Sequence, residues 1–476
     1  YADILGNLSG LSYQYKVYFD YHTEIARDPY TIATSENGKK SAILSNRDRV
    51  FAPFQSEAYE RADWRLENPC QAVIYEMHVR DLTISPSSGV DQAYRGTYRG
   101  AHQTGTKNAQ GDATAFDYIK ELGINVVQLQ PVSDRYKSYD EEGNVLYNWG
   151  YDVQNYSAPE TCYSTKPEDP KTTMRELKEL IHAYHEAGIS VVMDVVYNHI
   201  YSTEDGAFQT TVPDYYYRMN PNGSFQNGTG VGNETASEHE MYRKFMIDSL
   251  THWVTEYKID GFRFDLMGVH DIETMNEIRK AVNKVDPTIC IYGEGWAAEA
   301  PQYPADSLAM KGNISHMPGI AVFSDELRDG LCGPVWEKDK GAFLAGVPGG
   351  EMSVKFGIVG AIKHPQVRCD SVNYSQKPWA EQPTQMVSYV SCHDGLCLVD
   401  RLKASMPGAT PEQLVRLDKL AQTVVLTSQG IPFIYAGEEV MRDKQGIDNS
   451  YKSPDAINAI DWRRKTTNGD IFTYYK

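Results

Sequence analysis

Long apolar runs are missing from this chain of 476 residues, and positive charge is in short supply. No run approaches the roughly 20 apolar residues that a membrane-spanning helix needs. Lys and Arg together number 46 against 64 Asp and Glu, so the net charge is −18. Nucleic acid and anionic membrane surfaces would repel such a chain. We therefore expect neither of them as a partner, and a neutral ligand such as a sugar polymer instead.

Cysteine is also scarce, and its spacing is irregular. An odd number of scattered cysteines indicates buried thiols rather than a disulfide framework, and no Cys/His cluster with metal-ligand spacing occurs. We expect no required cofactor and no metal held by these side chains. The seven positions are Cys70, Cys162, Cys290, Cys332, Cys369, Cys392 and Cys397.

The two ends of the chain indicate a fragment of a longer protein. It opens on Tyr1 in the middle of a domain-like pattern, with no recognisable signal peptide, and it stops within the helical run Asp461–Lys476. We therefore expect the natural protein to continue. The compartment stays open, with the cytoplasm slightly favoured over secretion or the cell envelope.

Residues 1–66 alternate apolar and polar side chains, as in Tyr13–Phe19, with turn residues such as Asn37-Gly38 between the runs. That alternation predicts antiparallel β-strands. From residue 67 onward, short apolar runs alternate with amphipathic helical runs, which predicts an α/β fold. The predicted helices include Thr172–Ala187, Met241–Tyr257, Ile272–Val285 and Pro411–Thr427.

Eight buried strands alternating with helices predict that residues 67–476 form a (β/α)8 (TIM) barrel, with an incomplete last helix. The active site of such a barrel lies at the carboxyl ends of its strands. Two long segments after the second and third strands, 133–170 and 200–237, are typical of functional loops. The strands are Val73–Val79, Val126–Leu129, Ser190–Val195, Gly261–Phe264, Ile289–Gly293, Ile320–Phe323, Met386–Ser391 and Ile431–Tyr435.

Three acids lie at the ends of predicted strands: Asp265 and Glu294 directly after theirs, and Asp394 three positions after Ser391. Acids at successive strand ends should share one cleft at the barrel mouth. Two carboxyl groups flanking a scissile bond are what glycoside hydrolysis requires, one as nucleophile and one as proton donor. Each acid alone could be merely solvated or ion-paired, but their coincidence at strand ends favours the catalytic interpretation.

The neighbours of two of these acids suit different protonation states. Arg263 lies two positions before Asp265 on the same strand face, so it should lower the pKa of Asp265 and keep this nucleophile ionised. Glu294 should be protonated near neutral pH in order to donate a proton, and an apolar setting raises a carboxyl pKa. Tyr292 and Trp296 are the candidates for that setting.

Further polar groups are placed to support this chemistry. Asp194 can hold Arg263 through a bidentate pair, or the two can form a purely structural ion pair. Asn198 is a supporting residue, and His199 can bond a sugar hydroxyl. His393, beside Asp394, should grip a hydroxyl of the bound sugar and favour the distorted ring of the transition state. Adjacent strand residues face opposite ways, so Cys392 is expected to pack rather than pair with His393.

The segment Tyr147–Asp152 lies in the first long loop and reads Tyr-Asn-Trp-Gly-Tyr-Asp. Trp149 and Tyr151 flank a glycine and could form a stacking platform for a sugar ring, with Asp152 closing the polar edge. Taken alone, an aromatic cluster of this kind in a loop is more often a local core than a binding platform.

Together these motifs resemble the alpha-amylase family of glycoside hydrolases, which has a (β/α)8 barrel and a retaining mechanism. The resemblance implies that Asp265 is the nucleophile, Glu294 the general acid/base and Asp394 the transition-state stabiliser. It also implies substrate contacts from the remaining candidates. These are His199, Arg263 and His393, which match substrate-holding positions, and Tyr151, which matches the family's ring-stacking tyrosine.

Within that family, Tyr147–Asp152, Ile74–Asp81, Gly261–Gly268 and Gln445–Tyr451 are similar to the signatures of type I pullulanases. This implies cleavage of alpha-1,6 links in pullulan, glycogen and branched dextrins. We expect a monomer, although the sequence leaves the oligomeric state open. Residues 1–66 resemble the end of a starch-binding β-sandwich module, and the family's C-terminal β-domain is absent from this sequence. Val153 stands where the subfamily usually has Pro, and Gly395 where it usually has Asn.

Three alternatives stay open at this point. The chain could be an isoamylase-like debranching enzyme, an alpha-1,4-acting amylase or a glucan-binding fragment without catalysis. Some members of the family hold calcium through loop oxygens, and Asn198 lies at a suitable position, so a structural calcium also stays open.

Overall fold

The computed structural model describes residues 4–35, 37–56, 59 and 66–476. Its centre is a closed barrel of eight parallel strands, as the alternating pattern predicts. Within the described residues, no helix is long and apolar enough to cross a membrane. The barrel strands, in chain order, are β6 (Ile74–Met77), β7 (Val126–Leu129), β10 (Ser190–Val195), β11 (Gly261–Phe264), β12 (Cys290–Gly293), β13 (Ala321–Phe323), β14 (Met386–Ser388) and β15 (Ile431–Tyr435).

Four of these strands are shorter than predicted: β12 and β13 each start one residue later, and β6 and β14 differ more. β6 stops at Met77 because His78 caps the short helix α2 (Val79–Thr83), accepting a hydrogen bond from the backbone of Asp81. β14 stops at Ser388, so His393 lies in the turn that follows the strand. Apolar side chains of seven of the eight strands pack together in the barrel interior, among them Ile74, Val192, Tyr292, Phe323, Val387 and Phe433.

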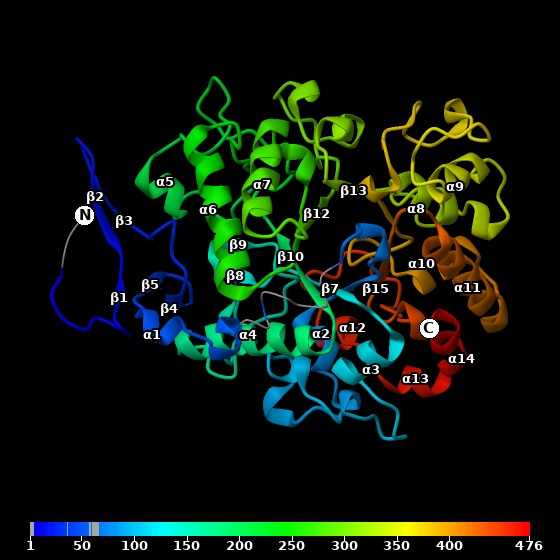
Figure 1. The fold of residues 1–476 in the computed structure, drawn as a ribbon, viewed down its shortest axis with the longest axis horizontal. Coiled ribbons are helices and arrows are strands. Elements are labelled where there is room, and N and C mark those ends of the chain that lie inside the picture. Colours follow the sequence, from blue (N-terminus) through cyan, green and yellow to red (C-terminus); the bar gives the residue numbers. More distant parts are fainter. Residues whose placement is uncertain (1–3, 36, 57–58, 60–65) are drawn as a thin grey trace.

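Helices surround the barrel (Figure 1). Predicted helices at 272–285 and 411–427 have the predicted bounds, because polar caps define their starts. Asp271 accepts from Thr274 N–H at 2.9 Å, and Thr410 forms a capping box with Gln413. The main helices are α3 (Ala115–Leu122), α4 (Pro170–Glu186), α6 (Glu240–Tyr257), α7 (Ile272–Val285), α8 (Asp325–Cys332), α9 (Glu351–Ile358), α10 (Leu398–Ser405), α11 (Pro411–Thr427) and α14 (Gly469–Tyr475).

Shorter elements occur in the connections. The first long loop contains an antiparallel hairpin, β8 (Ser133–Arg135) with β9 (Val153–Pro159), which the sequence interpretation treated as irregular. The second contains the short helix α5 (Ala207–Thr211). Two further short helices, α12 (Asp455–Asn458) and α13 (Arg463–Thr467), precede α14.

The N-terminal part consists of small antiparallel sheets at one side of the barrel, blue in Figure 1. β2 (Tyr15–Tyr18) pairs with β3 (Thr23–Ala26), and β1 (Ser12–Tyr13), β4 (Thr34–Ser35) and β5 (Lys40–Ala42) form a second sheet. The short helix α1 (Asn46–Arg49) follows. The proposed domain boundary at residue 66 adjoins positions outside the described residues and stays a prediction.

The turn Asn37-Gly38 joins β4 to β5 with φ values of 59° and 82°, the left-handed conformation expected for this pair. It docks against β9. Gln154 Nε2 donates to the Asn37 carbonyl at 3.2 Å, and Asn155 Nδ2 donates to the Gly38 carbonyl at 3.0 Å. A Cβ on Gly38 would lie 1.9 Å from Gln154 Nε2, so only glycine fits. The sheet of β1, β4 and β5 is therefore fixed to β9, the strand that follows the segment Tyr147–Asp152, which we call the aromatic loop.

The C-terminal segment packs tightly on the barrel. Trp462 is fully buried, its ring lies 4.7 Å from Tyr118 in an edge-to-face contact, and its indole N–H donates to the Leu82 carbonyl at 2.9 Å. Cavities left by a buried tryptophan typically cost about 3–5 kcal/mol. This one side chain therefore links α3, α2 and the C-terminal helices.

We predict that Trp462→Ala lowers the free energy of unfolding by about 3–5 kcal/mol, because it removes this packing and its hydrogen bond. Urea unfolding followed by circular dichroism measures the change. Trp336→Ala is the matched control, since Trp336 is 90% exposed, and should change stability by no more than about 0.5 kcal/mol. Equal effects of the two substitutions would contradict the packing described here.

Candidate active site

A single buried guanidinium connects three carboxyl groups at the barrel mouth. Arg263 Nη1 lies 3.0 Å from Asp194 Oδ1 and 3.1 Å from Asp265 Oδ1, and its Nη2 lies 2.7 Å from Glu294 Oε1. These residues come from the ends of β10, β11 and β12, which are neighbours in the barrel. The structure therefore brings the predicted nucleophile and the predicted proton donor into one cluster. Each contacts a different terminal nitrogen of the same guanidinium.

The strand register explains this meeting. Asp194 on β10 is level with Arg263 on β11, and Arg263 is level with Tyr292 on β12. Parallel neighbours at the same level point their side chains the same way, here into the barrel. Asp265 and Glu294 each follow their strand by one residue, so both carboxyl groups lie just above this layer.

Glu294 is buried and hydrogen-bonded at both oxygens. Oε2 accepts from the backbone N–H of Leu266 at 2.9 Å, and Leu266 adopts a left-handed conformation with φ of 38° that aims this N–H. Burial raises the pKa of Glu294 to about 7, and the nearby charges of Asp265 and Asp394 add to this against the opposing effect of Arg263. Glu294 can therefore carry a proton near neutral pH, as a general acid must.

Charge balance supports a proton on this cluster. Arg263 supplies one positive charge to three carboxyl groups, of which Asp194 and Glu294 are buried and Asp265 is the most exposed. An unpaired buried charge is costly, so the buried acids are the ones that hold protons. Burial raises the pKa of Asp194 to about 7, with the charge of Asp265 adding to the shift.

The predicted bidentate pair between Asp194 and Arg263 is not present. Only Oδ1 of Asp194 contacts the guanidinium, because its Oδ2 accepts the hydroxyl of Tyr151 at 2.6 Å. The carboxyl group of Asp194 is thus shared between Arg263 and the sugar-stacking candidate Tyr151. Asp194 links the position of that ring to the position of Arg263.

Asn198 and His199 hold neighbouring parts of the site. Asn198 Nδ2 donates to the Asp265 carboxylate at 2.9 Å and to its carbonyl at 2.8 Å, so Asn198 orients the nucleophile candidate directly. His199 Nε2–H donates to the Tyr151 carbonyl at 3.1 Å, and burial lowers the pKa of His199. The imidazole of His199 therefore steadies the aromatic loop beside the acids.

The sequence interpretation missed Glu76. This carboxylate on β6 is buried, accepts from His393 Nδ1–H at 2.7 Å and from the His393 backbone N–H at 2.8 Å. Gln128 Nε2 donates to Glu76 at 3.1 Å, and Tyr292 O–H donates to Gln128 at 2.7 Å. Burial alone would lower the pKa of His393, but the Glu76 carboxylate outweighs it and raises that pKa. The sequence signal that could have identified Glu76 is the presence of an acidic residue inside an otherwise apolar strand.

Two rings of the aromatic loop, those of Trp149 and Tyr151, differ in their exposure. Tyr151 is half-buried and stacks on His393, with ring centroids 4.9 Å apart. Trp149 is 5% exposed and packs edge-on against His393 and beneath the ammonium of Lys444. Trp149 therefore supports the loop from below, and its predicted contact with substrate is limited to its small exposed edge.

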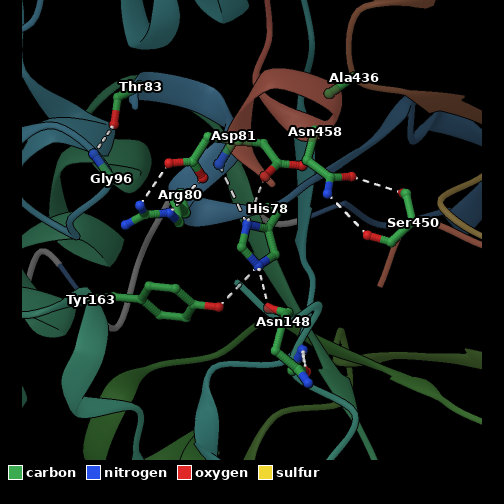
Figure 2. A network of polar contacts seen from close by, with 12 residues as sticks. His78, Arg80, Asp81, Thr83, Gly96, Asn148, Tyr163, Ala436, Ser450 and Asn458 are labelled. Atoms are coloured by element: carbon green, nitrogen blue, oxygen red, sulfur yellow. Dashed lines mark hydrogen bonds and ion pairs between the residues drawn. The ribbon is translucent and has the colours of Figure 1, made fainter. Parts of the chain in front are cut away.

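A buried network anchors the base of this loop (Figure 2). His78 Nε2–H donates to the Asn148 carbonyl at 3.2 Å, and the Tyr163 hydroxyl lies 2.9 Å from the same nitrogen. The other ring nitrogen of His78 faces Asp81, which also receives Arg442 Nη2 at 2.9 Å. The loop that presents Tyr151 is thereby tied to β6 and to the segment after β15.

Asp394 and Trp296 lie at the outer side of the cluster. Asp394 is exposed, yet its charge raises the pKa of Glu294, so the two carboxyl groups lie within electrostatic reach. Trp296 is half-buried and packs against the apolar barrel interior. Cys392 has no contact with the His393 ring in the described structure, and burial raises the pKa of its thiol, so it is not an activated nucleophile.

Both departures from the subfamily pattern have a local explanation. The Val153 N–H donates to the Tyr151 carbonyl at 2.9 Å, a hydrogen bond that a proline could not make. Gly395 has φ of +84°, a conformation that glycine adopts freely and asparagine tolerates best among the other residues. Neither change removes a group of the cluster.

All seven cysteines are free, as predicted, but only Cys332 and Cys397 are buried and the other five are partly exposed. Among the described residues, no group of three or more His, Cys, Asp or Glu side chains is arranged to hold a metal ion. The side chain of Asn198, the candidate calcium ligand, is engaged with Asp265. The expectation that no metal is required stays a prediction.

Comparison with known proteins agrees with this geometry. The family "Alpha amylase, catalytic domain" matches residues 92–229. The chain is 36% identical to the pullulanase of Bacillus subtilis (strain 168) over 98% of its own length and 62% of that protein. It is 27% identical to the chloroplastic isoamylase 3 of Oryza sativa subsp. japonica over 96% of its length and 62% of that protein.

A solved structure is still more similar. The crystal structure of Paenibacillus barengoltzii pullulanase in complex with maltohexaose and alpha-cyclodextrin matches with a TM-score of 0.91 and 42% identity. That match covers 99% of this chain and 71% of the other. The chain thus spans less than the full length of these relatives. From the barrel, the acid cluster and these similarities, the chain belongs to the pullulanase family, within the alpha-amylase family of glycoside hydrolases.

Proposed function

We propose that this chain hydrolyses alpha-1,6-glucosidic links in pullulan, glycogen and branched dextrins, with retention of configuration. The observation that carries the proposal is the contact of one guanidinium, Arg263, with both Asp265 and Glu294. A pair so placed suits double displacement, in which the two carboxyl groups lie close together. The maltohexaose and alpha-cyclodextrin in the Paenibacillus barengoltzii structure support a glucan as substrate.

In the proposed mechanism, Asp265 attacks the anomeric carbon while Glu294 gives its proton to the departing glycosidic oxygen. The first product leaves and a covalent glycosyl–Asp265 ester remains. Glu294, now ionised, takes a proton from water, and the oxygen of that water displaces Asp265. Glu294 ends protonated and Asp265 ends ionised, so the cycle is complete.

Other residues would hold the sugar during these steps. Tyr151, backed by Asp194 and His393, offers a ring face to the glucose unit at the acids. His393 and Asp394 would bond hydroxyls and favour the flattened ring of the transition state. The positive charge that Glu76 maintains on His393 suits a donor to such hydroxyls.

We predict that Asp265→Asn abolishes maltotriose release from pullulan and that Glu294→Gln lowers kcat by about 10²–10⁴-fold, as loss of a general acid does. Product chromatography measures both. Glu299→Gln is the matched control, because this nearby carboxylate is exposed, and it should keep full activity.

Circular dichroism of each variant separates lost chemistry from lost folding. Full activity of Asp265→Asn or Glu294→Gln would refute the assigned roles. Products other than maltotriose would favour an alpha-1,4-acting amylase, and glycogen debranching without pullulan cleavage would favour an isoamylase-like enzyme. Glucan binding with no turnover by the unmodified chain would indicate a non-catalytic fragment.

We predict that kcat falls above pH of about 7. Glu294 has its pKa raised to about 7 by burial and by neighbouring carboxylates, and only its protonated form can donate. Ionisation with rising pH therefore removes the active form, by about tenfold per pH unit well above the pKa. A pH profile of kcat between pH 5 and 9, with folding checked by circular dichroism, measures this. A profile flat to pH 9 would contradict the shift.

Glu76 should act as a positioning residue for His393. Glu76→Gln keeps the shape but removes the charge, so kcat should fall about 10–100-fold, the value of a hydrogen bond to a charged group. The pKa of His393 should also fall, because burial remains and the carboxylate is lost. Titration of His393 by NMR reports this. An unchanged His393 pKa would leave Glu76 a purely structural residue.

A further inference from the structure

A buried lysine packs against the aromatic loop, and the mechanism above does not use it. Lys444, in the segment after β15, is 1% exposed. Its backbone N–H donates to Asp400 Oδ2 at 2.7 Å, which fixes the start of the side chain. Among the described residues, no carboxyl group forms an ion pair with its ammonium. An unpaired buried charge is costly, so this ammonium needs other partners.

Two aromatic rings and one hydroxyl surround the ammonium. Lys444 Nζ lies 5.4 Å from the ring centroid of Trp149 and 5.1 Å from that of Tyr435. It donates to Ser450 Oγ at 2.9 Å, and the Ser450 hydroxyl donates in turn to Asn458 Oδ1 at 2.8 Å (Figure 2). A cation is attracted to the negative face of an aromatic ring, and the attraction is stronger where water is excluded. The rings and the hydroxyl thus replace water around this charge.

Trp149 connects the ammonium to the site. Its ring centroid lies 5.0 Å from that of His393, on which Tyr151 also stacks. The side chain of Asn148 holds the next part of the loop, because its Oδ1 accepts from the Gly150 N–H at 2.8 Å. A shift of the Trp149 ring would therefore move Tyr151 relative to the acids.

The charge of Lys444 changes near physiological pH. Burial, followed by the charge of Arg442, lowers the pKa of Lys444 to about 8. As the pH rises through about 8, the ammonium becomes a neutral amine and its attraction to the ring faces is lost. The titratable and charged groups that face Lys444 are Glu76 of β6, Asp81 of α2, Tyr435 of β15, Arg442, and Cys397 and Asp400 at the start of α10.

We propose that Lys444 is a positioning residue for glucan binding: its ammonium, held between Trp149 and Tyr435, fixes the aromatic loop and so keeps Tyr151 beside the acids. The identity of the ligand rests on the proposed function. The positioning role itself rests on the burial of the ammonium, on its two ring contacts and on the contact of Trp149 with His393. Lys444 is too deeply buried to contact a sugar, so it acts through Trp149.

Calorimetric titration with maltohexaose tests the role of the charge. The Glu294→Gln chain is the host, because it should bind glucan without consuming it. Lys444→Met removes the charge at similar length, so it should weaken binding about five- to thirtyfold, the value of a desolvated cation over an aromatic ring. Lys444→Arg keeps the charge and should retain most of the affinity.

The pH dependence of the same titration separates charge from shape. In the host, affinity should fall as the pH rises through about 8, because Lys444 loses its proton. Lys444→Arg should keep its affinity over this range, and Lys444→Met should bind weakly at every pH. Equal losses in Lys444→Arg and Lys444→Met, with both variants folded by circular dichroism, would overturn the role of the charge.

Two further variants keep the test decisive if a substitution of Lys444 does not fold. Ser450→Ala removes the hydroxyl that accepts from the ammonium, so the loss of affinity should move to lower pH. Lys465→Met is the matched control, because Lys465 is 7% exposed and its ammonium also lies over two rings, Tyr118 and Phe472, but it belongs to α13. It should change neither the affinity nor its pH dependence. An unchanged pH dependence in Ser450→Ala would contradict the proposal.

Amide hydrogen exchange without glucan separates this proposal from the proposed function. The Trp149 N–H donates to the Tyr451 carbonyl at 3.2 Å and the Gly150 N–H to Asn148, so both amides should exchange faster in Lys444→Met. If they do and the unmodified chain cleaves no alpha-1,6 link, the proposed function fails and the positioning role stands. If the chain cleaves pullulan and Lys444→Met alters neither exchange nor binding, the function stands and the positioning role fails.

Discussion

The site depends on a shortage of positive charge. Arg263 is buried and contacts three carboxyl groups, so a single cation cannot neutralise the cluster if all three are ionised. In a poorly solvated setting the imbalance is relieved by retained protons, and these belong on the most buried acids. The arrangement thereby favours a proton on Glu294, which is the state that the proposed double displacement requires of its proton donor. The charge imbalance thus arises from the contacts of a single side chain, Arg263.

The parallel barrel makes this cluster possible. Its register sets Asp194, Arg263 and Tyr292 in one layer, and the residues that follow the strands form the next layer up. A second buried chain of contacts, from Tyr292 through Gln128 and Glu76 to His393, crosses the same interior. The aromatic loop then adds Tyr151 between the two systems, since its hydroxyl contacts Asp194 and its ring stacks on His393.

The predictable parts of the structure were those with a local cause. The barrel strands are short apolar runs because parallel strands are buried on both faces, and α7 begins at its own capping residue, Asp271. The acids at the strand ends could likewise be predicted from the sequence. Glu76 was missed because its partner, His393, is 317 positions away. Trp149 was expected to face substrate, whereas its burial depends on Lys444 and His393, which only the folded chain brings near.

The docked turn Asn37-Gly38 has a consequence for engineering smaller versions of this protein. A truncated chain beginning at β6 would leave the amides of Gln154 and Asn155 without the carbonyls that they now bind. Both belong to β9, which continues directly from Tyr151 and Asp152. Removing the N-terminal sheets would thus weaken the support of the aromatic loop as well as shortening the chain. Domain shuffling should transfer these sheets and the barrel together.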